Sequence, residues 1–268
     1  MGKIKSAHYA LRIKNASAKI AFVTDLHNTQ NGPDNEDLLR MIEDEKPDLV
    51  LCGGDMIIGK PGVPTGPAER FLERLCSLFP VVHGVGNHEL RIRTYPDQYR
   101  GMYEHYRDFL TCRHIPYLEN DSIRMMIRGV PFAVFGLDPE AYYYNRYRRR
   151  ELPPDSIRSM LGEPDPACVN IMLAHTPLHM QSCFQWGADL TLCGHYHGGI
   201  MRFGMHRGLI SPDLRPFPGK CYGLFEEDGR YGIVSSGAGE HTIPLRIRNP
   251  REAVFIDIGP DTARHNGG

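Results

Sequence analysis

The chain has 268 residues, enough for one substantial α/β domain with a well-buried core, two small domains being the alternative. Its 31 Lys and Arg residues nearly balance its 32 Asp and Glu residues, so the formal net charge is −1. Proteins that bind long nucleic acid usually carry a basic excess that neutralises phosphates, and this composition therefore disfavours that class of partner.

The first third of the chain alternates apolar runs with amphipathic segments. Strands are expected over 19–23, 48–52 and 81–85, and helices around 38–42 and 71–75. Asp34 or Asn35 can cap the first of these helices, and Pro47 ends it. An order of strand, helix, strand, helix, strand is typical of a parallel α/β layer.

The rest of the chain is richer in strands. A helix is expected over 103–110 and a hairpin over 123–128 and 131–136, followed by strands over 170–174, 188–193, 231–235 and 253–257. No internal repeat or low-complexity linker interrupts this pattern. We therefore expect one domain over 1–268, of the α/β class, with two packed mixed β-sheets flanked by helices.

The cysteines and the hydropathy pattern indicate a compartment. There are 7 cysteines, an odd number, and none form a CxxC pair; several lie in apolar runs, as small buried residues do in reducing compartments. No stretch approaches the roughly 18 apolar residues of a membrane span, and the N-terminus lacks the apolar middle of a signal peptide. We expect a cytoplasmic protein.

Five of the expected strands end at side chains that can bind a metal ion. These side chains are Asp25 with His27, Asp55, Asn87, His175, and His195 with His197. Open α/β sheets place ligand sites just beyond the carboxyl ends of their strands, so the seven donors are expected on one rim. Glycines flank them, and glycine lets a backbone turn sharply or come close to an ion or phosphate.

The donor types favour a two-metal centre. Mixed carboxylate, amide and imidazole donors favour Mn, Fe, Zn or Ni over an all-oxygen calcium site. Seven ligands are too many for one tetrahedral zinc ion, whereas two ions that share a carboxylate fit the set. Two ions about 4 Å apart can bind a phosphate and activate a bridging water.

The order of the motifs resembles the calcineurin-like metallophosphoesterase family. The matching segments are Asp25-Leu26-His27, Gly53-Gly54-Asp55, Gly86-Asn87-His88-Glu89, Ala174-His175-Thr176-Pro177 and Gly194-His195-Tyr196-His197-Gly198-Gly199. Each motif alone is weak, but five in this order are strong. The tail around 233–239 and 244–247 resembles the bacterial branch of membrane-peripheral phosphodiesterases and UDP-2,3-diacylglucosamine pyrophosphatases.

The resemblance implies a four-layer sandwich and specific roles for the site residues. One metal would take Asp25, His27, Asp55 and His197, and the other would take Asp55, Asn87, His175 and His195. Asp55 would bridge the two ions, for which manganese is favoured, and a metal-bridging hydroxide would attack the phosphorus. His88 would face the substrate and act on the leaving oxygen, which makes Asp55 and His88 the expected catalytic residues.

The resemblance also implies a class of substrate. Hydrolysis of phosphodiester, pyrophosphate or phosphomonoester bonds is expected, in a lipid-linked or nucleotide-linked substrate and with a peripheral membrane contact as a further expectation. Alternatives are a protein or nucleotide phosphatase of the same superfamily and a scaffold that binds metal without catalysis. A nuclease is disfavoured by the balanced charge.

The segment 142–150 combines tyrosines with arginines. It is interpreted either as a solvated basic loop or as a lid that binds an anionic or lipid-bearing substrate through Arg and Tyr side chains. Candidate substrate-binding residues are Arg146, Arg148 and Arg149 in this segment and His206 after the last histidine motif.

Overall fold

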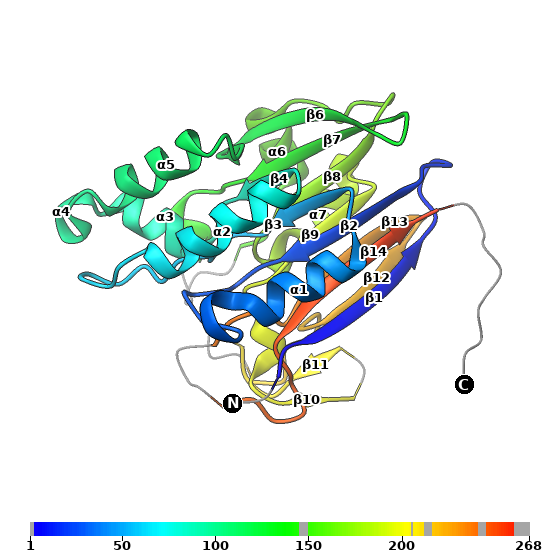
Figure 1. Ribbon diagram of the computed structural model, residues 1–268. Coiled ribbons are helices and arrows are strands. Elements are labelled where there is room, and N and C mark those ends of the chain that lie inside the picture. The colour runs from blue at the N-terminus through cyan, green and yellow to red at the C-terminus, as the bar shows by residue number, and fades with distance from the viewer. Residues whose placement is uncertain (1–2, 145–149, 205, 212–215, 241–244, 260–268) are drawn as a thin grey trace.

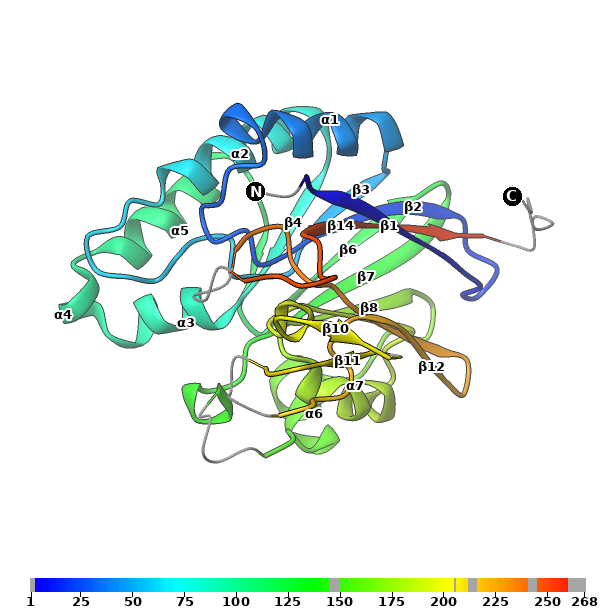
Figure 2. The same cartoon turned by 90° about the horizontal axis from the view of Figure 1, so that it is seen from below.

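The computed structural model describes residues 3–144, 150–204, 206–211, 216–240 and 245–259. Two six-stranded sheets stack face to face, and a layer of helices covers the outer face of each (Figure 1 and Figure 2). This confirms the expected α/β class with two packed mixed sheets.

The first sheet is built mainly from the N-terminal half of the chain. Its strands, in spatial order, are β1 (Lys5–Leu11), β14 (Glu252–Ile258), β2 (Ala18–Val23), β3 (Leu49–Cys52), β4 (Val81–Gly84) and β5 (Tyr117–Leu118). Its helices are α1 (Glu36–Glu45), α2 (Gly66–Leu78), α3 (Asn87–Thr94), α4 (Pro96–Tyr99) and α5 (Met102–Cys112). Strands β2 to β5 run parallel, as the alternating order predicted for the first three of them.

The second sheet comes from the C-terminal half. Its strands, in spatial order, are β12 (Gly223–Glu227), β13 (Arg230–Val234), β9 (Leu190–Cys193), β8 (Val169–Ala174), β7 (Val130–Leu137) and β6 (Asp121–Ile127). Its helices are α6 (Pro154–Leu161) and α7 (Met180–Trp186). The expected hairpin is β6–β7, and its turn residues Arg128 and Gly129 have φ of 48° and 81°, as a tight two-residue turn requires.

Short elements complete the fold at one end. They are β10 (Arg202–Phe203), β11 (Arg207–Gly208), η1 (Pro33–Asn35), η2 (Ala141–Tyr144), η3 (Pro177–His179) and η4 (His197–Gly199). Asn35 lies at the start of α1, but its Oδ1 accepts from the Asn31 backbone N–H and not from the helix. The expected side-chain cap of this helix is therefore wrong.

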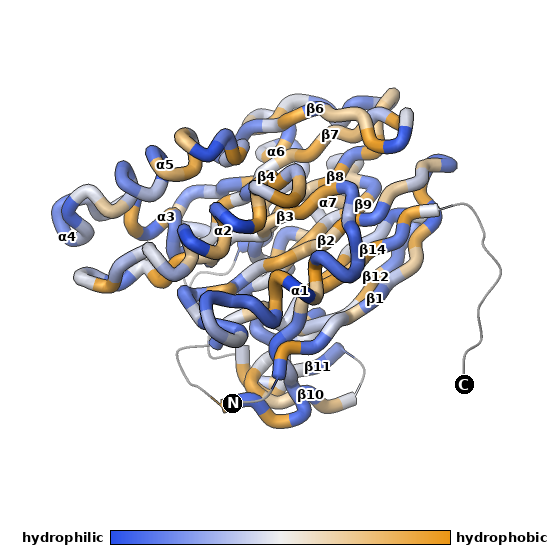
Figure 3. Tube along the Cα trace, viewed as in Figure 1, coloured by the Kyte–Doolittle hydropathy of each residue, from blue (hydrophilic) through white to orange (hydrophobic). Residues whose placement is uncertain are grey.

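The core consists of three apolar layers. Phe22 and Leu51 face Ile171 and Leu192 between the two sheets, where both strand sets are buried. A second layer packs α1, α2 and α5 on the first sheet, and a third packs α6 and α7 on the second. Figure 3 shows the apolar strands in the middle of the molecule. Across the described ranges, no helix has both the length and the apolar character needed to cross a bilayer.

Gly54 lies where the loops after β3 and β4 touch. Its φ is 88°, and a Cβ placed on it would lie 2.2 Å from the backbone nitrogen of Gly86. Only a residue without a side chain allows these two backbones to approach so closely. The contact sets the position of Asp55 relative to Asn87 on the next loop.

We predict that Gly54→Ala destabilises the protein more than Gly129→Ala. Both positions have positive φ, but a Cβ at Gly129 would meet nothing within 4 Å. Gly129→Ala should cost only the left-handed penalty of about 1–2 kcal/mol, and the clash at Gly54 should add about 1–3 kcal/mol. Urea unfolding of both variants measures the difference, and equal losses would contradict the close-approach explanation.

Candidate metal centre

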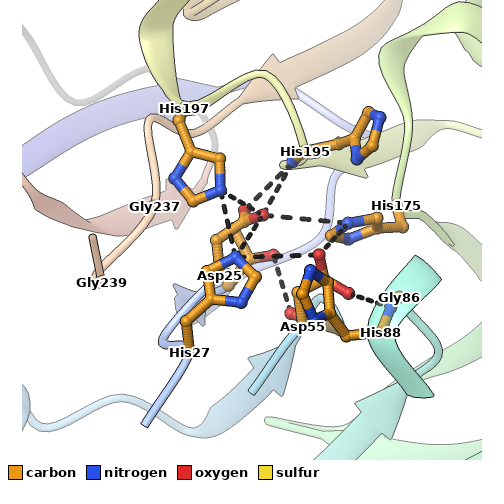
Figure 4. Close-up of polar contacts among 12 residues, drawn as sticks. Asp25, His27, Asp55, Gly86, His88, His175, His195, His197, Gly237 and Gly239 are labelled. Atoms are coloured by element: carbon orange, nitrogen blue, oxygen red, sulfur yellow. Dashed lines mark hydrogen bonds and ion pairs between the residues drawn. The ribbon is translucent and has the colours of Figure 1, made fainter. Parts of the chain in front are cut away.

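The seven predicted metal-binding residues lie together at the carboxyl ends of β2, β3, β4, β8 and β9. Figure 4 shows six of them, with His88, around one point between the two sheets. The ligand atoms form groups in which every pair lies within 4.8 Å, namely Asp25 with His27 and His197, Asp55 with His175 and His195, and His27 with Asp55 and His88. The sequence-based expectation of a single rim agrees with this geometry.

The backbone is strained at most of these positions. Positive φ angles, between 47° and 66°, occur at Asp25, His27, Asp55, His195 and His197. Residues with a Cβ pay roughly 1–3 kcal/mol for such conformations and adopt them mainly where a site requires it.

One half of the cluster surrounds Asp25. This carboxylate is fully buried and accepts hydrogen bonds from the backbone N–H of His195, at 3.1 Å to each oxygen. His197 Nε2 lies 3.4 Å from Asp25 Oδ1 and 3.1 Å from His27 Nε2. Burial lowers the pKa of His27 to about 4 against the attraction of Asp55, so its imidazole is neutral at pH 7 and can offer a lone pair.

The other half surrounds Asp55. Oδ2 of this carboxylate lies 3.1 Å from His175 Nε2 and 3.8 Å from His27 Nε2, so Asp55 stands between the two halves. Asn87 begins α3, and its Oδ1 is buried without a hydrogen-bond partner in the described part of the chain. His175 Nε2 is likewise buried and, among the described residues, has no hydrogen-bond partner, although it lies close to Asp55. Buried polar atoms left unpaired in this way fit a site built for cations.

Hydrogen bonds to the backbone distinguish His175 from His88. His175 Nδ1 lies 2.9 Å from the carbonyl oxygen of Gly53, which can only accept, so Nδ1 carries the proton and Nε2 can bind a metal. His88 Nδ1 lies 2.8 Å from the backbone N–H of Gly59, which can only donate. The proton of neutral His88 is therefore on Nε2, which leaves this nitrogen able to donate a hydrogen bond.

Glu89 was not assigned a role from the sequence, although it is the last residue of the Gly-Asn-His-Glu motif. Its carboxylate is fully buried and accepts from the backbone N–H groups of Asp55 at 2.8 Å, Met56 at 2.9 Å and Gly86 at 3.1 Å. It therefore fixes the loop that carries Asp55 against the start of α3. Its position in this motif is the sequence signal from which a role at the site could have been inferred.

Arg246 is a second residue whose role sequence reasoning missed. Its Nη2 donates to the carbonyl oxygens of Gly239 at 2.6 Å and Ser236 at 3.0 Å, and it lies 3.3 Å from His197 Nδ1. The two protons of Nη2 are used by the two carbonyls, so Arg246 holds the loop beside His197 without fixing its tautomer. The tail that resembled the bacterial branch contains this residue.

Of the four predicted substrate-binding residues, the structure describes only His206. Arg146, Arg148 and Arg149 lie outside the described residues. His206 Nδ1 contacts the Tyr222 carbonyl at 2.9 Å and its ring packs on Phe225. Tyr144, at the start of the same basic segment, lies with its ring 5.8 Å from that of His195. The described beginning of this segment is therefore beside the site.

Three comparisons place the chain among known proteins. Protein YpbG of Bacillus subtilis is 28% identical over 252 residues, covering 90% of this chain and 82% of YpbG. Phosphodiesterase YaeI of Escherichia coli is 25% identical over 247 residues, covering 91% of this chain and 83% of YaeI. The 5'-nucleotidase precursor of Thermus thermophilus shares the fold, with a TM-score of 0.50 and 14% identity over 90% of this chain and 55% of that one.

A family match covers the site itself. The sequence model described as calcineurin-like phosphoesterase matches residues 18–199, which is more than half of the chain. The matched segment runs from β2 to η4 and contains all seven predicted metal-binding residues. The chain belongs to the calcineurin-like phosphoesterase family.

Proposed function

We propose that this chain, acting as one domain over 1–268, hydrolyses phosphodiester, pyrophosphate or phosphomonoester bonds with two divalent metal ions. The observation that carries the proposal is the pair of donor groups around Asp25 and Asp55, with Asp55 between them. Two adjacent groups of carboxylate and imidazole donors match a centre that holds two ions.

The donor set supports a specific division of ligands. Asp25, His27 and His197 would hold one ion, and Asn87, His175 and His195 the other, with Asp55 shared by both. Nitrogen donors mixed with oxygen donors favour Mn, Fe, Zn or Ni, and manganese is our choice among them. Ions bound here would neutralise the phosphate charge and supply an activated water at neutral pH.

His88 would act on the leaving group. Burial lowers its pKa to about 4, against the opposing attraction of Asp55, so the ring is neutral at pH 7. Its Nδ1 accepts from Gly59, and its Nε2–H is therefore available for an oxygen of the substrate. In this role His88 stabilises negative charge on the leaving oxygen through a donated hydrogen bond.

We favour a phosphodiester or pyrophosphate substrate over a simple monoester. The similarity to a protein named phosphodiesterase supports the diester. Leu245 and Ile247 are 50% and 43% exposed and flank Arg246, which contacts His197. Exposed apolar side chains at the rim of the site support a lipid-linked substrate or a peripheral membrane contact. A nucleotide-linked substrate and a protein or nucleotide phosphatase are the alternatives.

A reducing compartment, and with it a cytoplasmic location, is part of the proposal. The seven cysteines are all free thiols, and five of them are buried. Burial raises the pKa of the Cys52 thiol, as expected for an unreactive packing residue.

We predict that Asp55→Asn abolishes the metal centre. A neutral amide cannot bridge two cations, so both ions should be lost or bound weakly. The loss in kcat/KM should exceed roughly 10- to 100-fold, the range that follows mutation of residues that hydrogen-bond to a metal ligand. Metal analysis of protein purified without chelator, together with hydrolysis of bis(p-nitrophenyl) phosphate, measures both effects.

The matched control for this prediction is Asp189→Asn. Asp189 also accepts from a backbone N–H, that of Asn170, but it lies before β9, at the other end of that strand from His195. It should lower stability without changing metal content. Two fully bound ions and wild-type turnover in Asp55→Asn would remove the basis of the proposed function.

We predict that His88→Asn separates metal binding from catalysis. Metal content should stay near that of the wild type, because His88 is a donor and not a ligand, while kcat should fall about 10²- to 10⁴-fold. His105→Asn, on the exposed face of α5, is the control and should change neither quantity. A loss of metal in His88→Asn that parallels the loss of activity would make His88 a ligand.

A further inference from the structure

Helix α3 carries two arginines with different surroundings. Arg93 forms ion pairs with Glu119 at 2.5 Å and Asp138 at 2.6 Å, which tie α3 to the loop between β5 and β6 and to the segment after β7. Arg91 is half-buried, yet its guanidinium has no ion pair or hydrogen bond within the described ranges. A partly desolvated cation without an internal partner is suited to an external anion.

Arg91 lies next to His88 on the helix surface. The two residues are three positions apart, and side chains at this spacing share one face of an α-helix. Arg91 lies close enough to His88 for its positive charge to act on the ring. Arg91 is therefore beside the group that faces the leaving oxygen in the proposed reaction.

The other wall of this region comes from the segment after β7. The short helix η2 packs against α3, and its last residue, Tyr144, lies beside His195 and 6.5 Å from the ring of His175. Tyr144 and Arg91 thus belong to two elements, η2 and α3, that pack against each other. An aromatic ring and a guanidinium on these elements suit a leaving group that carries both an apolar part and a charge.

We propose that Arg91 binds a second anionic group of the substrate, a phosphate attached beyond the leaving oxygen. This inference rests on the proposed function and narrows its substrate to esters or anhydrides whose leaving part carries its own phosphate. Arg91 is then a specificity-determining residue. Its guanidinium donates to the second phosphate while the first occupies the metal centre.

The test compares two inhibitors that differ by one anionic group. Methylphosphonate carries one phosphonate, whereas methylenediphosphonate carries two and is not hydrolysed. Calorimetric binding is measured with the metal in excess over the diphosphonate, for the wild type, Arg91→Ala, Arg91→Lys and the control Arg107→Ala on the exposed part of α5. Thermal unfolding checks that each variant is folded. If Arg91→Ala is unfolded, the comparison uses Arg91→Lys in its place.

The wild type should bind methylenediphosphonate more tightly than methylphosphonate. Arg91→Ala should weaken binding of the diphosphonate about 10-fold, which is at the low end for loss of a hydrogen bond to a charged group. It should change the affinity for methylphosphonate less than about 2-fold. Arg91→Lys should lie between, since it keeps the charge without the planar donor pair. Equal weakening of both inhibitors, no weakening, or the same effect in Arg107→Ala would overturn the proposal.

The binding and turnover measurements together distinguish failure of this inference from failure of the proposed function. If the wild type hydrolyses no phosphoester but shows the Arg91-dependent preference, the proposed function is wrong and the anion site stands. If it hydrolyses bis(p-nitrophenyl) phosphate and shows no such preference, the function stands and the role of Arg91 is wrong.

Discussion

The structure depends on accommodating three acidic side chains inside the protein. Asp25, Asp55 and Glu89 are each at most 2% exposed and lie in neighbouring loops. An isolated buried carboxylate costs several kcal/mol, so each must be compensated. The backbone supplies much of this compensation: His195 N–H donates to Asp25, His88 N–H donates to Asp55 at 2.7 Å, and three loop N–H groups donate to Glu89.

Much of the geometry of the site follows from this compensation. A loop that must point its N–H groups at a carboxylate cannot continue the strand direction, which accounts for the left-handed backbone at Asp25, Asp55 and His195. These hydrogen bonds also bring the loop backbone close to the carboxylate, so that a Cβ on Gly194 would lie 2.1 Å from Asp25 Oδ2. The glycines beside the donors therefore make room for protein atoms, where the sequence suggested room for an ion or a phosphate.

The remaining negative charge explains the histidines. Asp25 and Asp55 each have imidazoles within 4 Å, and His175 is held with its proton toward Gly53 and its free nitrogen toward Asp55. Burial alone would lower the pKa of His175, but the carboxylates of Asp55 and Asp25 raise it to about 10. A divalent ion bound here would compete with a proton for the Nε2 lone pair.

Much of the fold was predictable because it is encoded locally. Apolar runs such as 19–23 and 170–174 are fully or nearly buried parallel strands, and such strands show as continuous hydrophobic segments. The donors at their ends could be placed on one rim for the same reason. Strand β1 was missed because most of its residues are exposed on an edge, and α3 because its polar residues hide any apolar period.

The support around the donors could not be predicted. The acceptor role of Glu89 depends on N–H groups from residues more than thirty positions earlier, and Arg246 reaches His197 across 49 positions. The tautomers of His88 and His175 depend on Gly59 and Gly53, which no spacing rule connects to them. Such contacts exist only once the two sheets have packed.

The central claim is that the two donor groups bind two ions that share Asp55. Anomalous X-ray diffraction from crystals grown with manganese tests it most directly. The account predicts two anomalous peaks, one beside Asp25, His27 and His197 and the other beside Asn87, His175 and His195, with Asp55 contacting both and His88 contacting neither. A single peak, or a peak coordinated by His88, would contradict it.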